Sequence, residues 1–204
     1  SNIVNDTSGA VTISNHGHVV VGGAARFGAN GGDSDLQVLS GGWLETGGAG
    51  SKIGVGAGGT NKVLVSGTNS RWTAAGGLFV GEAGSGELLI EDGGAVSSPY
   101  AQVGGVFGNA GAGKLTITGS GSSLTVDQYM YLSDYSLDDG AANVTVQQGG
   151  TLDVGERLTM SPNSQINVNF PTGLIRIGNA TNTTALAGNV YVGNNGVLAG
   201  TGYL

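Results

Sequence analysis

The sequence predicts an all-β chain that folds as a β-solenoid, with three short strands in each coil. A triplet with Val, Leu or Ile at its first and third positions recurs along the chain at spacings of 22 to 29 residues. In addition, 42 of the 204 residues are glycine, and they fall between short alternating segments, where turns are expected. Because a repeat of this length without a helical pattern is typical of stacked coils, we expect about eight coils in a single domain over residues 1–204.

The pattern is clearest between Lys62 and Gly104, which holds two complete repeats. Each repeat begins with an alternating strand, passes a turn of polar residues and glycine, and continues with two more strands. The expected strands are 63–65, one around Trp72 and 78–80 in the first repeat, and 88–90, one around Val96 and 101–103 in the second. The other segments are looser copies of this arrangement.

The recurring triplet also predicts which side chains face the core. Its first and third positions are aliphatic in every copy, whereas the middle position is mostly polar. Since successive side chains of a strand point to opposite faces, the aliphatic positions should form ladders inside the solenoid, with neighbouring coils about 4.8 Å apart. The eight triplets are 11–13, 36–38, 63–65, 88–90, 115–117, 144–146, 166–168 and 190–192.

The turn after each triplet contains glycine beside a polar residue, so we expect a corner at which glycine supplies a positive φ. The connections after the third strand vary most in length and should project along one edge of the solenoid. They are expected at 22–34, 56–61, 81–86, 104–113 and 133–142. A function specific to this protein is expected on these connections.

Candidate partner-binding residues lie in these connections and on outward strand positions. The connections carry Arg26, Phe27, Phe107, Tyr135, Asp138 and Asp139. Tyr129 and Tyr131 face outward on one strand, and Tyr135 follows them. Because tyrosine gives a large contact area at small entropic cost, this group predicts a recognition patch. Ordinary packing between neighbouring strands is the alternative.

Charge and composition exclude several classes of function. The formal net charge is −7, and the 7 Lys and Arg residues form no cluster, which argues against nucleic-acid binding. No apolar run approaches the ~18 residues of a membrane-spanning helix. The chain has no cysteine, which is compatible with export in an unfolded state. The acidic balance favours basic partners.

Acidic clusters raise the alternative of a calcium site. The segment 31–35 and the carboxylates of Asp134, Asp138 and Asp139 offer the oxygen ligands that Ca²⁺ prefers. The segment occurs once, however, without the tandem copies that share each ion in calcium-binding repeats. We therefore expect solvated loop charges and no metal site.

The sequence lacks the groups of residues that the common enzymatic mechanisms require. His16 and His18 have no third His or Cys to complete a metal site, and no Gly-x-Ser-x-Gly motif supports a catalytic triad. A polysaccharide-active enzyme is the main enzymatic alternative, but it needs carboxylates at a defined separation in a groove. Asp138 and Asp139 are adjacent, with no Lys or Arg beside them. We expect a protein without catalytic activity, cofactor or metal.

Several blocks share one motif. The segments 55–65, 80–90 and 103–117 follow the pattern Val-Gly-x-Gly-x-Gly-x-Leu-x-Ile with small variations, and 196–202 reads Gly-Val-Leu-Ala-Gly-Thr-Gly. Together they resemble the passenger repeats of AIDA-type autotransporters, the type V secretion proteins of Gram-negative bacteria. The resemblance covers most of the chain and is strongest between Leu36 and Met160.

The resemblance implies a right-handed parallel β-helix, displayed at the bacterial cell surface or outer membrane, or secreted after cleavage. We expect the chain to be a fragment of a longer passenger, attached to the membrane only through a C-terminal barrel outside the fragment. It would act as a non-enzymatic adhesin that binds a host cell-surface or matrix protein, or another passenger, through loops and outer strand faces. A released ligand for a host receptor and a polysaccharide-active enzyme remain alternatives.

Overall fold

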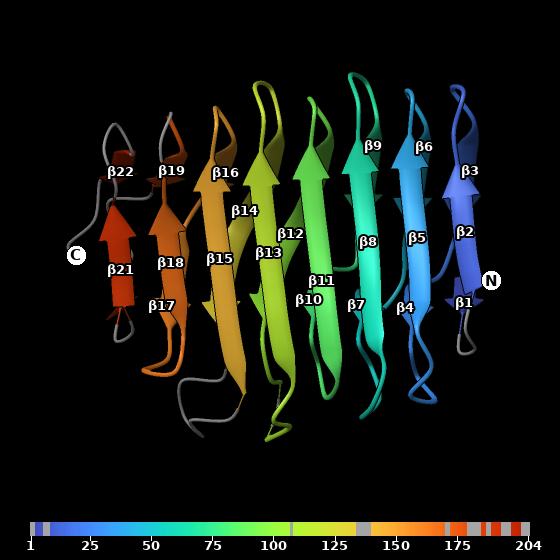
Figure 1. The fold of residues 1–204 in the computed structure, drawn as a ribbon, viewed down its shortest axis with the longest axis horizontal. Coiled ribbons are helices and arrows are strands. Elements are labelled where there is room, and N and C mark those ends of the chain that lie inside the picture. Colours follow the sequence, from blue (N-terminus) through green and yellow to red (C-terminus); the bar gives the residue numbers. More distant parts are fainter. Residues whose placement is uncertain are drawn as a thin grey trace.

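A computed structural model describes residues 9–106, 108–133, 140–169 and 172–178, and the backbone of 3–5, 185–186, 189–192 and 197–200. Strands joined by turns and bends make up this part of the chain, and no residue in it is helical. Every strand pairs in parallel with strands of neighbouring repeats. The chain is therefore an all-β solenoid, as the sequence predicts (Figure 1).

The strands form three faces that run the length of the solenoid. Face 1 is the eight-stranded sheet β2 (Gly9–Ile13), β5 (Ser34–Leu39), β8 (Thr60–Ser66), β11 (Ser85–Glu91), β13 (Ala112–Thr118), β15 (Ala141–Gln147), β18 (Gln165–Val168) and β21 (Asn189–Val192). Face 2 contains β3 (His18–Val21), β6 (Trp43–Thr46), β9 (Arg71–Ala74), β16 (Thr151–Val154), β19 (Leu174–Ile177) and β22 (Val197–Gly200). Face 3 contains β1 (Ile3–Asn5), β4 (Ala25–Phe27), β7 (Ser51–Ile53), β10 (Leu78–Val80), β17 (Arg157–Met160) and β20 (Ala185–Leu186).

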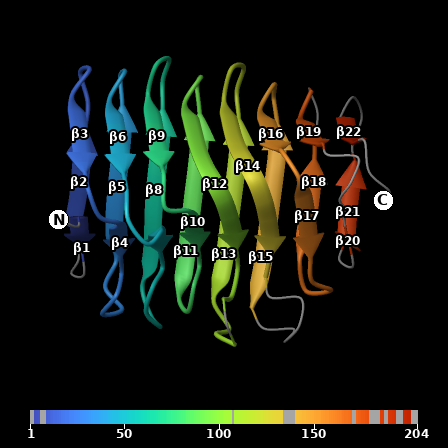
Figure 2. The same ribbon diagram turned by 180° about the vertical axis from the view of Figure 1, so that it is seen from behind.

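Two long strands join faces 2 and 3. β12 (Ala95–Val103) and β14 (Ser123–Leu132) each run from face 2 onto face 3 without a break, which Figure 2 shows from behind. The register between them shifts between Ser98 and Tyr100, where Pro99 lies. Proline donates no ladder hydrogen bond and is tolerated at such irregularities, so this bulge makes the bend between the faces.

The strand register confirms the predicted ladders. Leu88 lies between Val63 and Leu115 on the neighbouring strands, and Ile90 lies between Val65 and Ile117. The same pairing continues through the remaining triplets of face 1. The spacing of the triplets along the chain therefore gives the correct alignment of the coils, although the coils differ in length.

The chain winds in a right-handed sense, because it rises through face 1, crosses behind at the top of the view and advances leftward (Figure 1). Six successive turns, from β2 to β17, contain all three segments with described side chains. The strands β18 to β22 continue the same stack. The expected count of about eight coils matches the strands of face 1 and slightly exceeds these six turns.

The core consists of the predicted aliphatic ladders. Leu88 and Ile90 are fully buried, whereas Leu89 between them lies partly exposed on the outer surface. The largest buried side chain is Trp72 on β9, and its indole Nε1 donates a hydrogen bond to Thr46 Oγ1 at 3.1 Å. The alternation of burial thus confirms the face assignment. The buried N–H group of Trp72 has a hydrogen-bond partner inside the core.

In the corner after a face 1 strand, some residues adopt a positive φ, and another lies against the preceding coil. After β11, Asp92 and Gly93 both have a positive φ, of 53° and 86°. Gly94 follows, and a Cβ there would overlap the Val65 carbonyl of the preceding coil. The polar residue therefore shares the left-handed conformation expected of glycine alone, and the last glycine is required by close stacking between coils.

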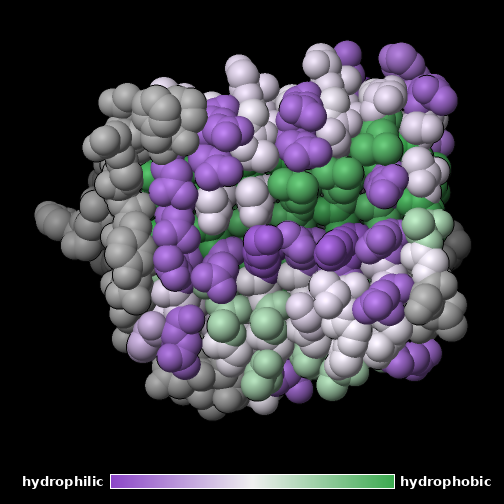
Figure 3. Space-filling view, viewed as in Figure 1, coloured by the Kyte–Doolittle hydropathy of each residue, from purple (hydrophilic) through white to green (hydrophobic). Residues whose placement is uncertain are grey.

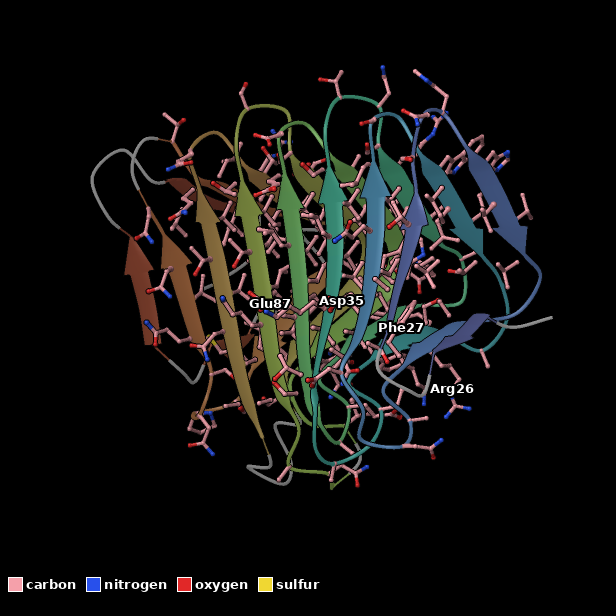
Figure 4. All side chains as sticks on the ribbon, turned by 45° about the vertical axis from the view of Figure 1, so that its right-hand side comes forward. Arg26, Phe27, Asp35 and Glu87 are labelled. Carbon is pink, nitrogen blue, oxygen red and sulfur yellow. The ribbon has the colours of Figure 1, made fainter. Side chains whose placement is uncertain are left out.

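One expected connection contains a strand. The segment 22–34 includes β4, whose residues pair with β1 and β7. The prediction that Phe27 binds a partner is therefore wrong, because its side chain is fully buried in the core. Arg26 beside it is exposed, and Figure 4 shows the two side chains on opposite sides of the strand.

Candidate partner-binding surface

The outer surface of face 3 carries a row of large polar and aromatic side chains. They occupy the middle position of the strand segments and pair in register from coil to coil. In order, the row contains Arg26, Lys52, Phe79, Gln102, Tyr131 and Thr159. A second row beside it contains Tyr100, Tyr129 and Arg157. We call these two rows together the aromatic–basic surface.

Two aromatic rings of this surface lie over glycines of the preceding coil. A Cβ at Gly50 would come within 2.6 Å of the Phe79 ring, and a Cβ at Gly77 would overlap the Tyr100 ring. The rings of Phe79 and Tyr100 meet edge to face, with centroids 5.8 Å apart. Tyr100 Oη also donates a hydrogen bond to the Gly76 carbonyl at 2.6 Å. Glycine in one coil therefore fixes the position of an aromatic ring in the next.

Arg157 holds the two predicted tyrosines together. Its guanidinium carbon lies 5.3 Å from the Tyr129 ring centroid and 5.7 Å from that of Tyr131. Its Nη2 donates a hydrogen bond to Tyr131 Oη at 2.7 Å. Cations packed over aromatic rings in this way are stabilised by the ring quadrupole. The tyrosines thus lie in a defined arrangement on the surface.

Tyr129 is the most exposed aromatic side chain of this group, with 36% of its surface accessible. A hydrogen bond to Glu156 and the negative charge of that carboxylate raise the pKa of the Tyr129 phenol, while Arg157 opposes the shift. The phenol therefore stays neutral over the physiological range. It presents an apolar ring with a hydrogen-bonding hydroxyl to solvent.

The aromatic–basic surface is less acidic than the chain as a whole. Three of the seven Lys and Arg residues lie on it: Arg26, Lys52 and Arg157. Lys52 Nζ lies 5.5 Å from the Phe79 ring centroid and forms an ion pair with Glu82 at 2.5 Å. The charged side chains of the two rows are thus all basic, and Glu82 contacts them from beside the rows.

The structure groups some of the predicted partner-binding residues and separates others. Arg26, Tyr129 and Tyr131 share the aromatic–basic surface, the two tyrosines together on β14 and Arg26 on the distant strand β4. Phe107, Tyr135, Asp138 and Asp139 lie outside the described residues. Sequence reasoning missed Phe79 and Tyr100, which complete the surface. Both occupy outward positions of face 3 strands, so strict alternation from the buried neighbours Leu78 and Ala101 would have found Phe79 and pointed to Tyr100.

A second ring stack lies on the outer surface of face 2. The His18 and Trp43 rings are parallel, with centroids 3.9 Å apart, and the Arg71 guanidinium lies 4.0 Å from the Trp43 ring centroid on the next coil. His18 also hydrogen-bonds Glu45 at 2.9 Å. Both faces of the indole are therefore covered within the chain. This stack is a structural ladder and does not present the Trp43 ring for binding.

The histidines and the acidic segment considered as metal ligands do not come together in the described part of the chain. His16 lies in the turn before β3 with a φ of 61°, so it does not share a strand with His18. Asp33 Oδ1 accepts a hydrogen bond from the Thr60 amide at 2.6 Å. In the part of the chain that the structure describes, no group of three or more His, Asp or Glu is placed to hold a metal ion.

Comparison with known proteins does not assign the chain to a family. No protein-family model, curated protein sequence or solved structure matches it. A search for membrane spans found, among the described residues, no helix with the length and apolar character needed to cross a bilayer.

Proposed function

We propose that this chain is a non-enzymatic binding rod, displayed on a bacterial surface or released from it, that engages a protein of a host or neighbouring cell. The observation that carries the proposal is the aromatic–basic surface on face 3. Aromatic and arginine side chains dominate the energetics of protein–protein contacts, and here several of them lie on one continuous face. The resemblance of the repeats to autotransporter passengers supports the setting.

The geometry of the surface favours a protein partner over a small molecule. The four rings and the Arg157 guanidinium extend over four successive strand segments, β10, β12, β14 and β17. The rings are those of Phe79, Tyr100, Tyr129 and Tyr131. Neighbouring segments are about 4.8 Å apart, so the group spans about 14 Å along the solenoid. The side chains are held by glycine contacts and by Arg157, so little entropy is lost when a partner binds them.

The experiment measures binding of the labelled chain to cultured mammalian cells and to a panel of immobilised matrix proteins. The variant Phe79→Ala/Tyr129→Ala removes two outward-facing rings and should weaken binding at least about tenfold. Thr125→Ala on the outer surface of face 2 is the matched control and should bind as the unchanged chain does.

Two results would contradict the proposal. Equal binding by the double variant and the control would remove face 3 as the contact surface. Release of new reducing or unsaturated ends from a glycan panel by the purified chain would show catalysis, and the non-enzymatic proposal would be wrong. Signalling by the soluble chain in cells that bind it would identify the partner as a receptor.

A further inference from the structure

Face 1 carries a row of alternating charges on its outer surface. Asp35, Lys62, Glu87 and Lys114 occupy equivalent positions on four successive strands, because each pairs in register with the next. Lys114 Nζ forms an ion pair with Glu87 at 2.6 Å. Figure 3 shows this row as a band of hydrophilic side chains across the strands, and Figure 4 labels Asp35 and Glu87 within it.

An apolar centre lies beside this row. The adjacent outward position holds Gln37, Leu64, Leu89 and Thr116 on the same four strands. Leu64 and Leu89 are partly exposed. Figure 3 shows a hydrophobic patch on this face, next to the hydrophilic band. With Lys62 and Glu87 they line a hollow of about 220 Å³. The two leucines thus occupy the two central coils of the charged row.

This arrangement is self-complementary under a two-fold rotation. A rotation about an axis parallel to the strands, lying between the coils of Lys62 and Glu87, reverses the coil order and keeps each row opposite itself. Asp35 then faces Lys114 of the second copy, and Lys62 faces Glu87. Leu64 faces Leu89 in the neighbouring row. All four charge contacts join opposite signs, and the apolar centres meet.

We propose that face 1 binds a second copy of this chain, face to face and with the coils running in opposite directions. Isologous contacts of this kind close into a dimer because the same patch serves both copies. The proposal does not rest on the proposed function, which uses face 3.

The alternating charges specify one register. A slip by one coil would place Lys62 opposite Lys62 and Asp35 opposite Glu87, and coils running in the same direction would place each charge opposite itself. Like charges brought together in an interface disfavour such arrangements. Alternating charges also stabilise a single chain through cross-strand pairs. That role does not account for two leucines at the centre of the row.

The available area fits a weak, reversible dimer. Six coils overlap in the proposed register, since the coil of Ala10 faces that of Asn143 at the ends of the charged row. Six coils at about 4.8 Å and about six residues of strand at about 3.3 Å give about 570 Å² per copy. The total of about 1,140 Å² exceeds the roughly 1,000 Å² expected of a biological interface and falls in the range of weak, reversible contacts, below about 1,200 Å².

Two charge swaps with the same net charge test the proposal. Lys62→Glu/Glu87→Lys keeps opposite signs in all four contacts between copies. Glu87→Lys/Lys114→Glu makes all four contacts like-charged. Within one chain the order is reversed, because the first swap leaves one attractive neighbour pair in the row and the second leaves two. Sedimentation velocity of the full chain at an ionic strength of about 0.05 M measures the dimer constant, and circular dichroism checks that each variant is folded.

The unchanged chain and the first swap should dimerise within about threefold of each other, and the second swap should weaken dimerisation at least about tenfold. The proposal is wrong if the unchanged chain stays monomeric to about 1 mM, or if the second swap dimerises as well as the first.

Cross-linking gives a second readout that needs no charge change. The chain has no cysteine, so Gln37→Cys and Thr116→Cys introduce single thiols. In the proposed register these positions face each other, whereas each lies about 14 Å from its own copy along the solenoid. A short bis-maleimide should link a mixture of the two variants and leave each variant alone mostly unlinked. Equal linking of the single variants would overturn the register.

Discussion

The substitution Ile117→Ala tests the ladder of face 1 directly. Ile117 is fully buried on β13, between Ile90 and Val146 on the neighbouring strands. The change removes three carbon atoms, worth about 2.4 kcal/mol of transfer free energy at about 0.8 kcal/mol each. The cavity left between two packed coils adds to this, so we expect a loss of about 3–4 kcal/mol in the free energy of unfolding.

Thr116→Ala is the matched control on the same strand. Thr116 faces outward and is partly exposed, so its truncation should cost less than about 1 kcal/mol. Urea unfolding followed by far-ultraviolet circular dichroism, at a concentration where the chain is monomeric, measures both variants. Similar losses for the two substitutions would refute the assignment of inward and outward positions, and with it the stacked ladders.

Three further predictions concern a corner, a titration and the corrected residue. Gly94→Ala should lower the free energy of unfolding by more than about 3 kcal/mol, because a Cβ would overlap the Val65 carbonyl. Gly93→Ala should lower it by only about 1–2 kcal/mol, through the positive φ at that position. Equal losses for the two variants would contradict close stacking of the coils at Gly94. Glu156→Gln should lower the pKa of Tyr129, read as phenolate absorbance against Tyr129→Phe. Because the pKa of Tyr129 is raised in the folded chain, its contribution to the free energy of unfolding is present below the ordinary value of about 10 and is lost as pH rises through the folded pKa. An unchanged titration of Tyr129 in Glu156→Gln would exclude the Glu156 contact. Phe27→Ala should reduce stability by about 3–5 kcal/mol in thermal unfolding, and a loss below about 1 kcal/mol would mean that this ring is not in the core.

The sequence predicted the parts of the fold that depend on local alternation. The aliphatic positions of face 1, such as Leu88 and Ile90, are inward as expected, and their register follows from the spacing of the triplets. This worked because a one-residue slip would move the aliphatic side chains out of the core. The differing coil lengths are absorbed at the corners and connections, so they leave the register intact.

The missed features depend on contacts between coils. β4 has only three residues and is followed by glycine at position 28, so the short alternation of Ala25 and Phe27 gives little signal against a connection. The ring positions of Phe79 and Tyr100 depend on Gly50 and Gly77 in the preceding coil, which become neighbours only once the coils are stacked. Contacts about 25 residues apart in the sequence cannot be inferred from the pattern of a single strand.

The parallel ladders also determine how the rod would respond to a pulling force along its axis. Hydrogen bonds between coils lie along that axis, so tension loads successive ladders in series and opens them by peeling. A coil of about 25 residues, once released, adds roughly 80–90 Å of extended chain at about 3.3–3.6 Å per residue. Stretched by its ends, the molecule should therefore lengthen in steps of this size, one turn at a time.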